Sequence, residues 1–409
     1  MRLIHTSDWH LGHEILGFDR GPEHDHFLAW LKGQVTALAA DVLLVTGDLY
    51  DTVNPSTAAQ GRLYEFLASL LRDVPGLQIV LTGGNHDSAA RLELPCPLLD
   101  STRITIIGAV PRRDGRPDPA ALSVPLRRRD GTPAAWCVAV PYLRPGDLPE
   151  PADGESGIAR LHRLAVAHAD AQRGNLPLVV TGHLHVTGGE ISELSERRVV
   201  IGGEETVPVS IYPPHAAYVA LGHLHRPQRL KGPTEIRYAG SPFPLSVTER
   251  HYRHGILLVE LDADGRSRVE PVQAPRLVPF LRVPAQGAAP LETIEAELQA
   301  LTLDDPGRER RPFLEVVVRL DGPQPDLRRL IDQALQGKPV RLVRIGREAP
   351  AAAAGQKEAA ARELAELAET DVFAELHRAE HGGQDPAPDL LQAFKELLAE
   401  VQQAEGAPR

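Results

Sequence analysis

The sequence is poor in cysteine and contains no long apolar run, and each shortage excludes a class of protein. Its 409 residues include only two cysteines, Cys96 and Cys137, too few for a disulfide framework or a thiolate metal site. No stretch approaches the about 20 consecutive apolar residues of a membrane span, and the first residues turn polar before a signal-peptide core could form. We therefore expect a cytoplasmic globular protein without membrane contact, in which nitrogen and oxygen atoms would hold any metal.

The chain also lacks a GxxxxGK[ST] phosphate loop and has a formal net charge of −11. Without that loop we do not expect the chain itself to hold ATP in the usual way. A negative charge argues against a nucleic-acid partner, because Lys and Arg neutralise phosphates. However, residues 351–409 carry 12 acidic and only 5 basic residues, so much of the negative charge lies in the tail. Net charge therefore does not exclude DNA as a substrate.

Short apolar runs alternate with helical patterns over the first 260 residues, which predicts an α/β fold with buried strands. Helices are predicted at 27–39 and 56–71. Strands are predicted at residues 3–6, 42–46, 79–82, 104–110, 136–141, 178–181, 218–221, 236–239 and 256–261.

Four prolines between 271 and 284 interrupt the apolar pattern and predict a domain boundary. Beyond it, a strand at 313–320, a helix at 326–336 and a strand at 340–345 fit a small α+β module. The predicted organisation is a main domain at 1–270, a small capping domain at 276–347, a linker at 348–357 and a helix-loop-helix at 358–409.

The tail is predicted to contain two amphipathic helices, because its apolar residues recur at close to 3.6-residue spacing. The residues expected to bind a partner are Leu364, Leu367, Phe373 and Leu376 on the first helix and Leu391, Phe394 and Leu398 on the second. Two short helices after an Ala-rich linker cannot bury such stripes alone. The stripes therefore face either a partner protein or the chain's own domain.

Five short motifs stand where predicted strands end: DWH at 8–10, GDLYD at 47–51, GNHD at 84–87, GHLH at 182–185 and GHLH at 222–225. The carboxyl ends of strands in an open α/β sheet are where ligands bind, so these loops can converge on one site. Their Asp, Asn and His side chains supply oxygen and nitrogen donors, which suit Mn, Fe or Zn in a hydrolytic site. Glycine before a donor lets the backbone approach the metal closely.

Each motif alone has a simpler structural explanation. A single His at a strand end is usually a hydrogen-bonded structural residue, Asp8 or Asp48 could cap a helix or form a turn, and Asn85 could form an Asx turn. Five such motifs in order, each closing an apolar strand, are hard to explain by structural needs alone. The set therefore predicts a metal site.

The order of these motifs resembles that of calcineurin-like metallophosphoesterases. Longer strings are similar to the SbcD family, the nuclease subunits of bacterial SbcCD complexes: HTSDWHLG (5–12), VTGDLYDTVNPS (45–56), GGNHDSAARLE (83–93), GHLHVTGGEISE (182–193), YVALGHLHRPQ (218–228) and YAGSPFPLSV (238–247). The resemblance implies a β-sandwich flanked by helices, a small capping domain and a C-terminal helix-loop-helix. It spans residues 1–262 by motif and the remainder by layout.

The resemblance also implies a centre of two divalent metal ions, with manganese expected. One ion would take Asp8, His10, Asp48 and His225, and the other Asp48, Asn85, His183 and His223, so that Asp48 bridges them. Such a pair can activate a water and stabilise charge on a phosphodiester.

His86 is not a metal ligand in the family pattern and is expected to act in catalysis, by stabilising the transition state or protonating the leaving oxygen. The alternative is a histidine that only orients Asn85 through a hydrogen bond. Archaeal and eukaryotic relatives have a second such histidine where this chain has Asp51, which makes a two-histidine mechanism doubtful here.

The resemblance implies a metal-dependent DNA nuclease that degrades double-strand ends and cuts single strands and hairpins, and that docks its tail on an SbcC-like ATPase. It also implies a homodimer, for which the predicted helix at 56–71 is a candidate surface. Arg91, Arg226 and Arg229 lie beside the motifs and are candidate DNA contacts. The main alternative is a calcineurin-like phosphodiesterase acting on a small molecule, because a metal site alone does not select DNA.

Overall fold

The computed structural model describes residues 1–99, 103–151, 154–192, 196, 206–320 and 322–348, and in the tail 373, 377–378, 384–387, 390–392 and 394. The chain divides into two compact units. The first comprises Met1–Leu281, Thr302–Glu315 and Gly337–Arg344, and the second comprises Arg282–Leu301, Val316–Gln336 and Ile345–Arg409.

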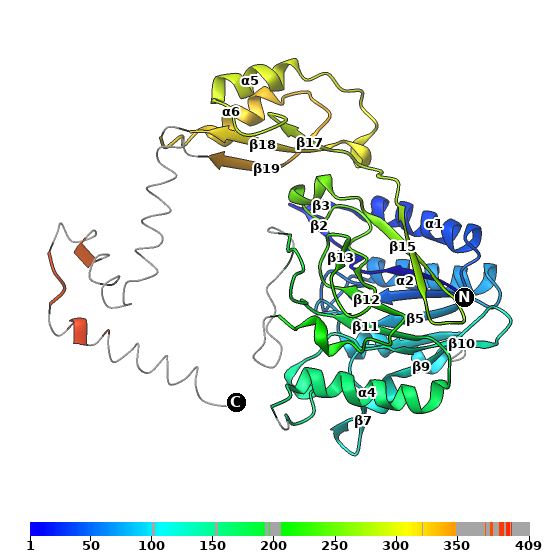
Figure 1. The fold of residues 1–409 in the computed structure, drawn as a ribbon. Helices are drawn as coiled ribbons and strands as arrows, with labels where there is room; N and C mark the ends of the chain where they lie inside the picture. The colour runs from blue at the N-terminus through cyan, green and yellow to red at the C-terminus, as the bar shows by residue number, and fades with distance from the viewer. Residues whose placement is uncertain are drawn as a thin grey trace. The chain divides into compact units, whose positions relative to one another are not determined.

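Two six-stranded sheets form the centre of the first unit (Figure 1). The first runs in the order β16 (Ser267–Gln273), β15 (Gly255–Leu261), β1 (Arg2–Thr6), β4 (Val42–Thr46), β5 (Gln78–Thr82) and β6 (Ile104–Ile107). The second runs in the order β13 (Gln228–Leu230), β14 (Ile236–Tyr238), β12 (Tyr218–Gly222), β11 (Leu178–His183), β10 (Pro133–Val138) and β9 (Ser123–Arg127). Four neighbouring strands of each sheet are parallel, and antiparallel strands flank them.

The central strands β4, β5, β11 and β12 are mostly apolar because both of their faces are buried, whereas the edge strand β16 is largely exposed. Successive side chains alternate between the faces. Val42 and Leu44 of β4 belong to the core shared with the second sheet, whereas Leu43 and Val45 belong to the core beneath the helices of the first sheet.

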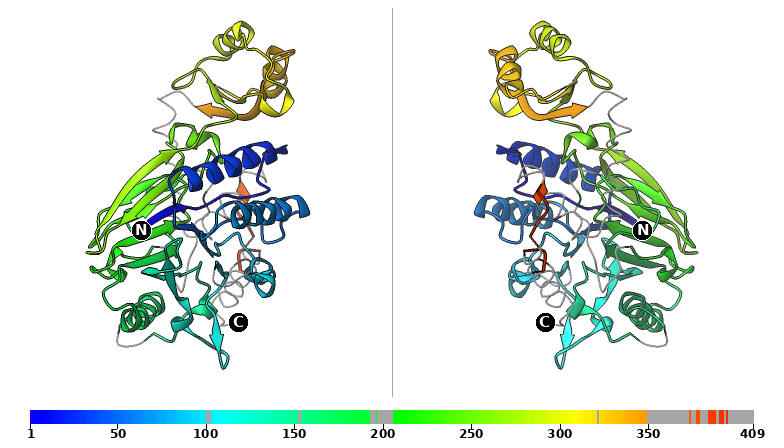
Figure 2. Two further views of the ribbon diagram at one scale, coloured as in Figure 1. Left: turned by 90° about the vertical axis from the view of Figure 1, so that its right-hand side faces the viewer. Right: turned by 90° about the vertical axis from the view of Figure 1, so that its left-hand side faces the viewer.

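Helices cover the outer faces of both sheets. The long helices α1 (Gly21–Ala37) and α2 (Thr57–Asp73) lie on one side and α4 (Gly157–Arg173) on the other, as the views of Figures 1 and 2 agree. Ser56 caps α2 by accepting a hydrogen bond from the backbone N–H of Ala59. The resulting helix–sheet–sheet–helix layering confirms the predicted α/β sandwich, although α4 was not predicted.

Short elements connect these layers. They are the hairpin β2 (Glu14–Ile15) and β3 (Phe18–Asp19), the hairpin β7 (Arg112–Arg113) and β8 (Arg116–Pro117), the helix α3 (Ala89–Glu93), and the 3-10 turns η1 (Cys96–Leu98), η2 (Pro119–Leu122), η3 (Pro145–Asp147), η4 (Val209–Ile211), η5 (Val247–His251) and η6 (Arg308–Arg310). The turn η5 and helix α3 are the ones that bear on the site.

In the later part of the chain, β17 (Phe280–Val283), β18 (Phe313–Arg319) and β19 (Arg341–Glu348) form a three-stranded sheet. The helices α5 (Leu291–Ala300) and α6 (Leu327–Ala334) contribute buried apolar residues to the second unit. The proline-rich stretch separates β16 from β17, and Pro271 is accommodated because β16 is an edge strand. Among the described residues, no helix combines the length and apolarity of a membrane span.

Candidate metal centre

The structure brings the candidate donors together at the carboxyl ends of parallel strands from both sheets. Asp8 and His10 follow β1, Asp48 follows β4, and Asn85 and His86 follow β5. From the second sheet, His183 ends β11, and His223 and His225 follow β12. The facing sheets thus deliver residues as far apart in the sequence as Asp8 and His223 to one place.

Four of these donors have left-handed backbone conformations, which residues other than glycine adopt rarely. The φ angles are 54° for Asp8, 47° for His10, 50° for Asp48 and 100° for His223. Each such residue costs about 1–3 kcal/mol unless the surrounding structure holds it, and such residues cluster at functional sites.

Two glycines show why the motifs need a residue without a side chain. A Cβ atom on Gly47 would lie 2.2 Å from Nδ1 of His183. A Cβ atom on Gly84 would lie 2.1 Å from Oδ1 of Asp48. Both separations are far below van der Waals contact, so a larger residue at either position would displace a donor.

Asp48 lies at the centre of the cluster and is only 2% exposed. Its Oδ2 lies 3.3 Å from Nε2 of His183 and 3.5 Å from Nε2 of His10. Its Oδ1 accepts a hydrogen bond of 2.8 Å from the backbone N–H of His86. One carboxylate therefore faces donors from both sheets, as a bridging ligand must.

Asn85 and two histidines form one side of the cluster. The side-chain oxygen of Asn85 lies 3.0 Å from Nε2 of His183 and 3.0 Å from Nδ1 of His223. The other nitrogen of His183 contacts the carbonyl oxygen of Thr46 at 2.8 Å. Because a carbonyl can only accept, Nδ1 of His183 carries a hydrogen and Nε2 is directed at Asp48 and Asn85.

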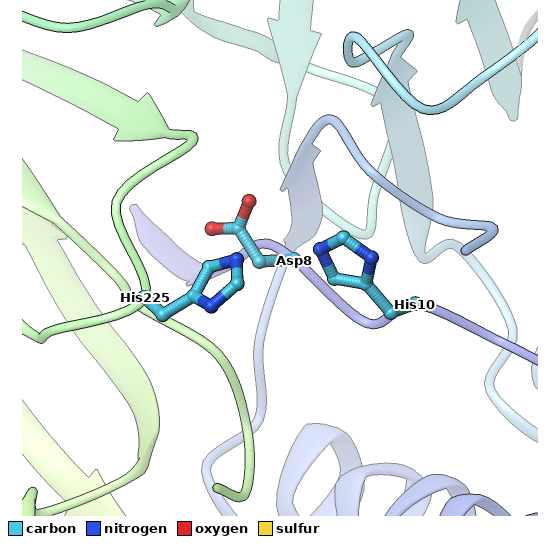
Figure 3. Close-up of side chains that lie close together, drawn as sticks. All are labelled: Asp8, His10 and His225. Carbon is cyan, nitrogen blue, oxygen red and sulfur yellow. The ribbon is translucent and has the colours of Figure 1, made fainter. Parts of the chain in front are cut away.

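Asp8, His10 and His225 form the other side, where Figure 3 shows Asp8 between the two imidazole rings. One donor atom from each lies within 4.8 Å of the others. Oδ1 of Asp8 accepts a hydrogen bond from the backbone N–H of His223, and Oδ2 accepts one from the hydroxyl of Ser7. These contacts fix the Asp8 carboxylate in place.

The buried carboxylates raise the pKa values of two donor histidines, whereas burial lowers the pKa of His223 to about 3. Burial opposes a charge on His183, but Asp48 outweighs it and raises the pKa of His183 to about 9. Burial is likewise outweighed at His225, where Glu249 raises the pKa to about 10. Burial alone would raise the pKa of Asp48, yet His183 and His10 hold it well below its usual range. A potential that attracts protons so strongly also attracts divalent cations.

The donor set fits a divalent cation by a second observation. Nε2 of His10 is fully buried and has no hydrogen-bond partner among the described residues. Three groups of donors could each surround an ion: Asp8, His10 and His225; His10, Asp48 and His86; and Asp8, Asp48 and His183. A cation among them would satisfy the orphaned nitrogen, which otherwise carries the cost of a buried unpaired polar atom.

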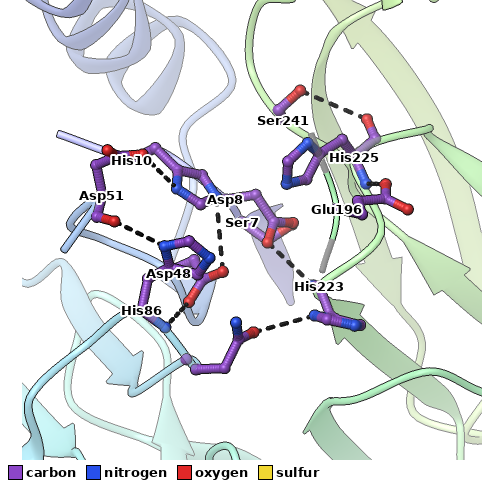
Figure 4. A network of polar contacts seen from close by, with 12 residues as sticks. Ser7, Asp8, His10, Asp48, Asp51, His86, Glu196, His223, His225 and Ser241 are labelled. Carbon is purple, nitrogen blue, oxygen red and sulfur yellow. Dashed lines mark hydrogen bonds and ion pairs between the residues drawn. The ribbon is translucent and has the colours of Figure 1, made fainter. Parts of the chain in front are cut away.

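His86 lies within reach of His10 and Asp48, so distance alone does not separate it from the ligands. Its Nδ1 donates to the carbonyl oxygen of Asp51 at 2.6 Å, while the Asp51 side chain accepts from Nδ1 of His10 at 3.2 Å (Figure 4). Asp51 therefore orients both rings, a role that the sequence did not suggest. Burial lowers the pKa of His86.

Two further carboxylates support the centre and were not predicted from the sequence. Oε1 of Glu249, in η5, accepts from Nδ1 of His225 at 2.9 Å, and Glu249 is fully buried. Glu196 accepts from the backbone N–H of His225 (Figure 4). The family-like segment at 238–247 was the sequence signal nearest to Glu249, and it contains Ser241, whose hydroxyl donates to Oε2 of Glu249.

Asp87, the last residue of the third motif, organises the turns rather than facing the ions. Its carboxylate accepts hydrogen bonds from the backbone N–H groups of Leu49, Tyr50 and Gly84 at 2.8–3.1 Å. Burial, with the charge of Asp48, raises its pKa to about 6. Asp87 thus ties the second motif to the third.

We expect Glu249→Gln to weaken metal binding by about 10- to 100-fold, because partners that orient a ligating histidine have effects of this size. Oε1 of Glu249 accepts from His225 while Oε2 accepts from the backbone N–H of Leu245 at 2.8 Å. An amide must point its NH2 at one of these donors. Titration calorimetry with Mn²⁺ measures the effect. Glu260→Gln, on the partly exposed side of β15, is the matched control, and equal affinities in the two variants would contradict the role of Glu249.

The structure also describes the three predicted DNA contacts and three of the predicted tail residues. Arg91 is exposed on α3, Arg226 pairs with Glu190, and Arg229 of β13 pairs with Glu235 at 2.6 Å. In the tail, the rings of Phe373 and Phe394 stack with centroids 4.2 Å apart, and Leu391 is half-buried. The predictions for Leu364, Leu367, Leu376 and Leu398 lie outside the described residues.

Comparison with known proteins agrees with this geometry. Residues 1–227 match the calcineurin-like phosphoesterase family, and residues 276–381 match the family described as the type 5 capsule protein repressor C-terminal domain. The chain is 44% identical over 351 residues to the SbcD subunit of the SbcCD nuclease from Rhodobacter capsulatus, and the match covers 84% of this chain and 86% of that protein. It is 32% identical over 369 residues to the protein of the same name from Escherichia coli K12, covering 85% and 86%.

Proposed function

Because this chain belongs to the calcineurin-like phosphoesterases and, within them, to the SbcD family of nucleases, we propose that it is a DNA nuclease that degrades double-strand ends and cuts single strands and hairpins. The observation that carries the chemistry is the buried cluster around Asp48, where Nε2 of His10 makes no hydrogen bond among the described residues and lies 3.5 Å from Oδ2 of Asp48. The match of the later residues to a second family supports the SbcD-type nuclease over a general phosphodiesterase.

The cluster would hold two divalent ions, with manganese as the expected metal. Asp8, His10, Asp48 and His225 would hold one ion, and Asp48, Asn85, His183 and His223 the other. Bound metal ions would supply an activated water and charge stabilisation for the phosphodiester.

The chain's own residues hold and orient these groups. Asp51 fixes the rings of His10 and His86, Glu249 fixes the ring of His225, and Asp87 ties the two turns that carry Asp48 and Asn85. His86 is the catalytic residue of the proposal. With Nδ1 donating to the carbonyl of Asp51, Nε2 would donate to a phosphoryl or leaving oxygen when the ring is protonated to imidazolium.

DNA would be positioned by contacts to its phosphates, for which Arg91, Arg226 and Arg229 are candidates. The salt bridges of Arg226 and Arg229 would have to exchange carboxylates for phosphates. We further propose that an SbcC-like ATPase is the partner and that the tail, including Phe373, Leu391 and Phe394, contacts it. The names of the relatives, which are components of an SbcCD nuclease, support such a partner.

A homodimer is also part of the proposal. Large apolar side chains are exposed at Tyr64 on α2 and at Leu94 and Leu98 after α3, and Leu98 is 89% exposed. We expect Leu98→Glu to weaken self-association by at least about tenfold, because a two-fold interface would bury this side chain twice. Light scattering during size-exclusion chromatography measures the mass. Leu16→Glu, at another exposed leucine, is the control; a wild-type chain that stays monomeric at all concentrations would reject the dimer.

The decisive experiment is Mn²⁺-dependent cleavage of a labelled DNA hairpin and of a blunt duplex, with and without the partner ATPase. The nuclease proposal expects products that disappear when the metal is chelated. Hydrolysis of a small chromogenic phosphodiester without cleavage of either DNA would replace it with a general phosphodiesterase.

A further inference from the structure

A pocket of about 620 Å³ lies within the first unit, at the edge of the first sheet where β15 begins, β16 ends and β1 leads to the metal centre. Its lining includes Trp30 of α1, Phe243, Tyr252, and Gln273 and Arg276 near the end of β16. The volume is in the range of small-molecule sites. Trp30 and Tyr252 are half-buried and Arg276 is exposed, so aromatic surface and a guanidinium both reach the opening.

The pocket is connected to the ligands of the metal centre by direct contacts. The guanidinium of Arg226, the residue after His225, lies 5.6 Å from the centroid of the Tyr252 ring. The backbone N–H of Tyr252 donates to the carbonyl oxygen of Glu249 at 2.9 Å, and Glu249 orients His225. Two hydrogen bonds, from Tyr252 to Glu249 and from His225 to Glu249, therefore link the lining of the pocket to a predicted metal ligand.

Guanidinium groups lie in and beside the pocket, although the chain as a whole is acidic. Arg226 and Arg250 form ion pairs with Glu190 and Glu315. Within the described residues, Arg253 and Arg276 form no ion pair with a carboxylate, and both are exposed. Aromatic faces beside unneutralised guanidinium groups match a planar base attached to a phosphate, and they match an apolar peptide less well.

We propose that this pocket binds an unpaired nucleobase of a single-stranded DNA segment that leads into the metal centre. The inference rests on the proposed nuclease function and adds a binding site for one base of the DNA substrate. Bases within a duplex are stacked on their neighbours, whereas an unpaired base in a hairpin loop or frayed end presents a free face to Trp30 and Tyr252. The pocket would thereby favour substrates with unpaired nucleotides next to the cut.

Trp30 makes the proposal testable without measuring cleavage. The chain has three tryptophans, and Trp9 is fully buried. In a Trp136→Phe variant of the full chain, Trp30 is then the accessible fluorophore. Titration in EDTA with an oligothymidylate of about eight nucleotides should quench it, because bases stack on aromatic rings. An abasic oligomer of equal length, which keeps the phosphates and lacks the bases, should not.

We expect Tyr252→Ala to reduce the affinity for the oligothymidylate about tenfold or more, the usual effect of losing one stacking ring. Tyr252→Phe keeps the ring and should bind like wild type. Trp30→Phe should abolish the fluorescence response.

The proposal that the pocket binds a base would be rejected if the abasic oligomer quenched Trp30 as strongly as the oligothymidylate. It would also be rejected if Tyr252→Ala bound the oligothymidylate with unchanged affinity. The proposal would also be rejected if acrylamide failed to quench the fluorescence of Trp30 in the absence of DNA, because the chain itself would then fill the pocket. Hairpin cleavage by wild type in Mn²⁺, measured in parallel, separates the two proposals. Cleavage without base-dependent quenching rejects the pocket alone, whereas quenching without cleavage rejects the nuclease and keeps the pocket.

Discussion

Replacing Asp48 with asparagine is expected to lower metal-dependent phosphodiester cleavage by at least about 1,000-fold. Oδ1 of Asp48 accepts from the backbone N–H of His86, and Oδ2 faces the nitrogens of His10 and His183. An asparagine of the same size must place its NH2 group on one side or the other. One orientation opposes an N–H group, and the other presents hydrogens where a cation should bind.

The measurement is Mn²⁺ binding by calorimetry together with cleavage of the DNA hairpin. Asp41→Asn is the matched control, because Asp41 precedes the same strand β4 that Asp48 follows and accepts from the backbone N–H groups of Arg2 and Arg129. We expect the control to cleave at close to the wild-type rate. An Asp48→Asn variant that keeps both metal affinity and cleavage within about threefold of wild type would remove Asp48 from the centre.

The motifs that carry the donors could be predicted from the sequence because the physics that places them is local, whereas the choice of the seven donors within those motifs came from the family resemblance. A strand buried on both faces is a continuous apolar run, such as residues 42–46 or 178–181, and the polar residue that ends it must lie at the edge of the sheet. The structure brings all seven predicted donors and His86 to one edge of the sandwich. Their roles as ligands stay a prediction.

The supporting residues could not be predicted because their roles depend on distant segments. Glu249 has no recognisable spacing to His225, and it reaches that ring only because η5 folds back across the sheet edge. Helix α4 was missed for a different reason. Its buried face includes Ala165 and Ala169 beside Ile158 and Leu161, so the apolar stripe is weak in the sequence.

His86→Ala is expected to lower cleavage by about 100- to 10,000-fold, the range for a residue that transfers or stabilises a proton in the transition state. Metal binding should change little, because the Nδ1 of His86 is used by Asp51 and the other donors do not depend on its ring. The contrast with Asp48→Asn is the informative one. The aspartate variant should lose metal and activity together, whereas the histidine variant should lose activity alone.

The alternative for His86 is that it only orients Asn85, by holding the turn that carries Asn85 against the turn that carries Asp51. That role predicts a different pattern, in which His86→Ala lowers metal affinity and thermal stability along with the rate. Calorimetry, thermal unfolding and hairpin cleavage on the same sample separate the two, with His168→Ala, at a half-buried histidine on α4, as the control for removal of a histidine. Because the carbonyl of Asp51 already fixes Nδ1, the free Nε2 is the only ring nitrogen available to a substrate. Full activity in His86→Ala would therefore leave the chain without an identified proton donor and would shift that role to another group beside the cluster.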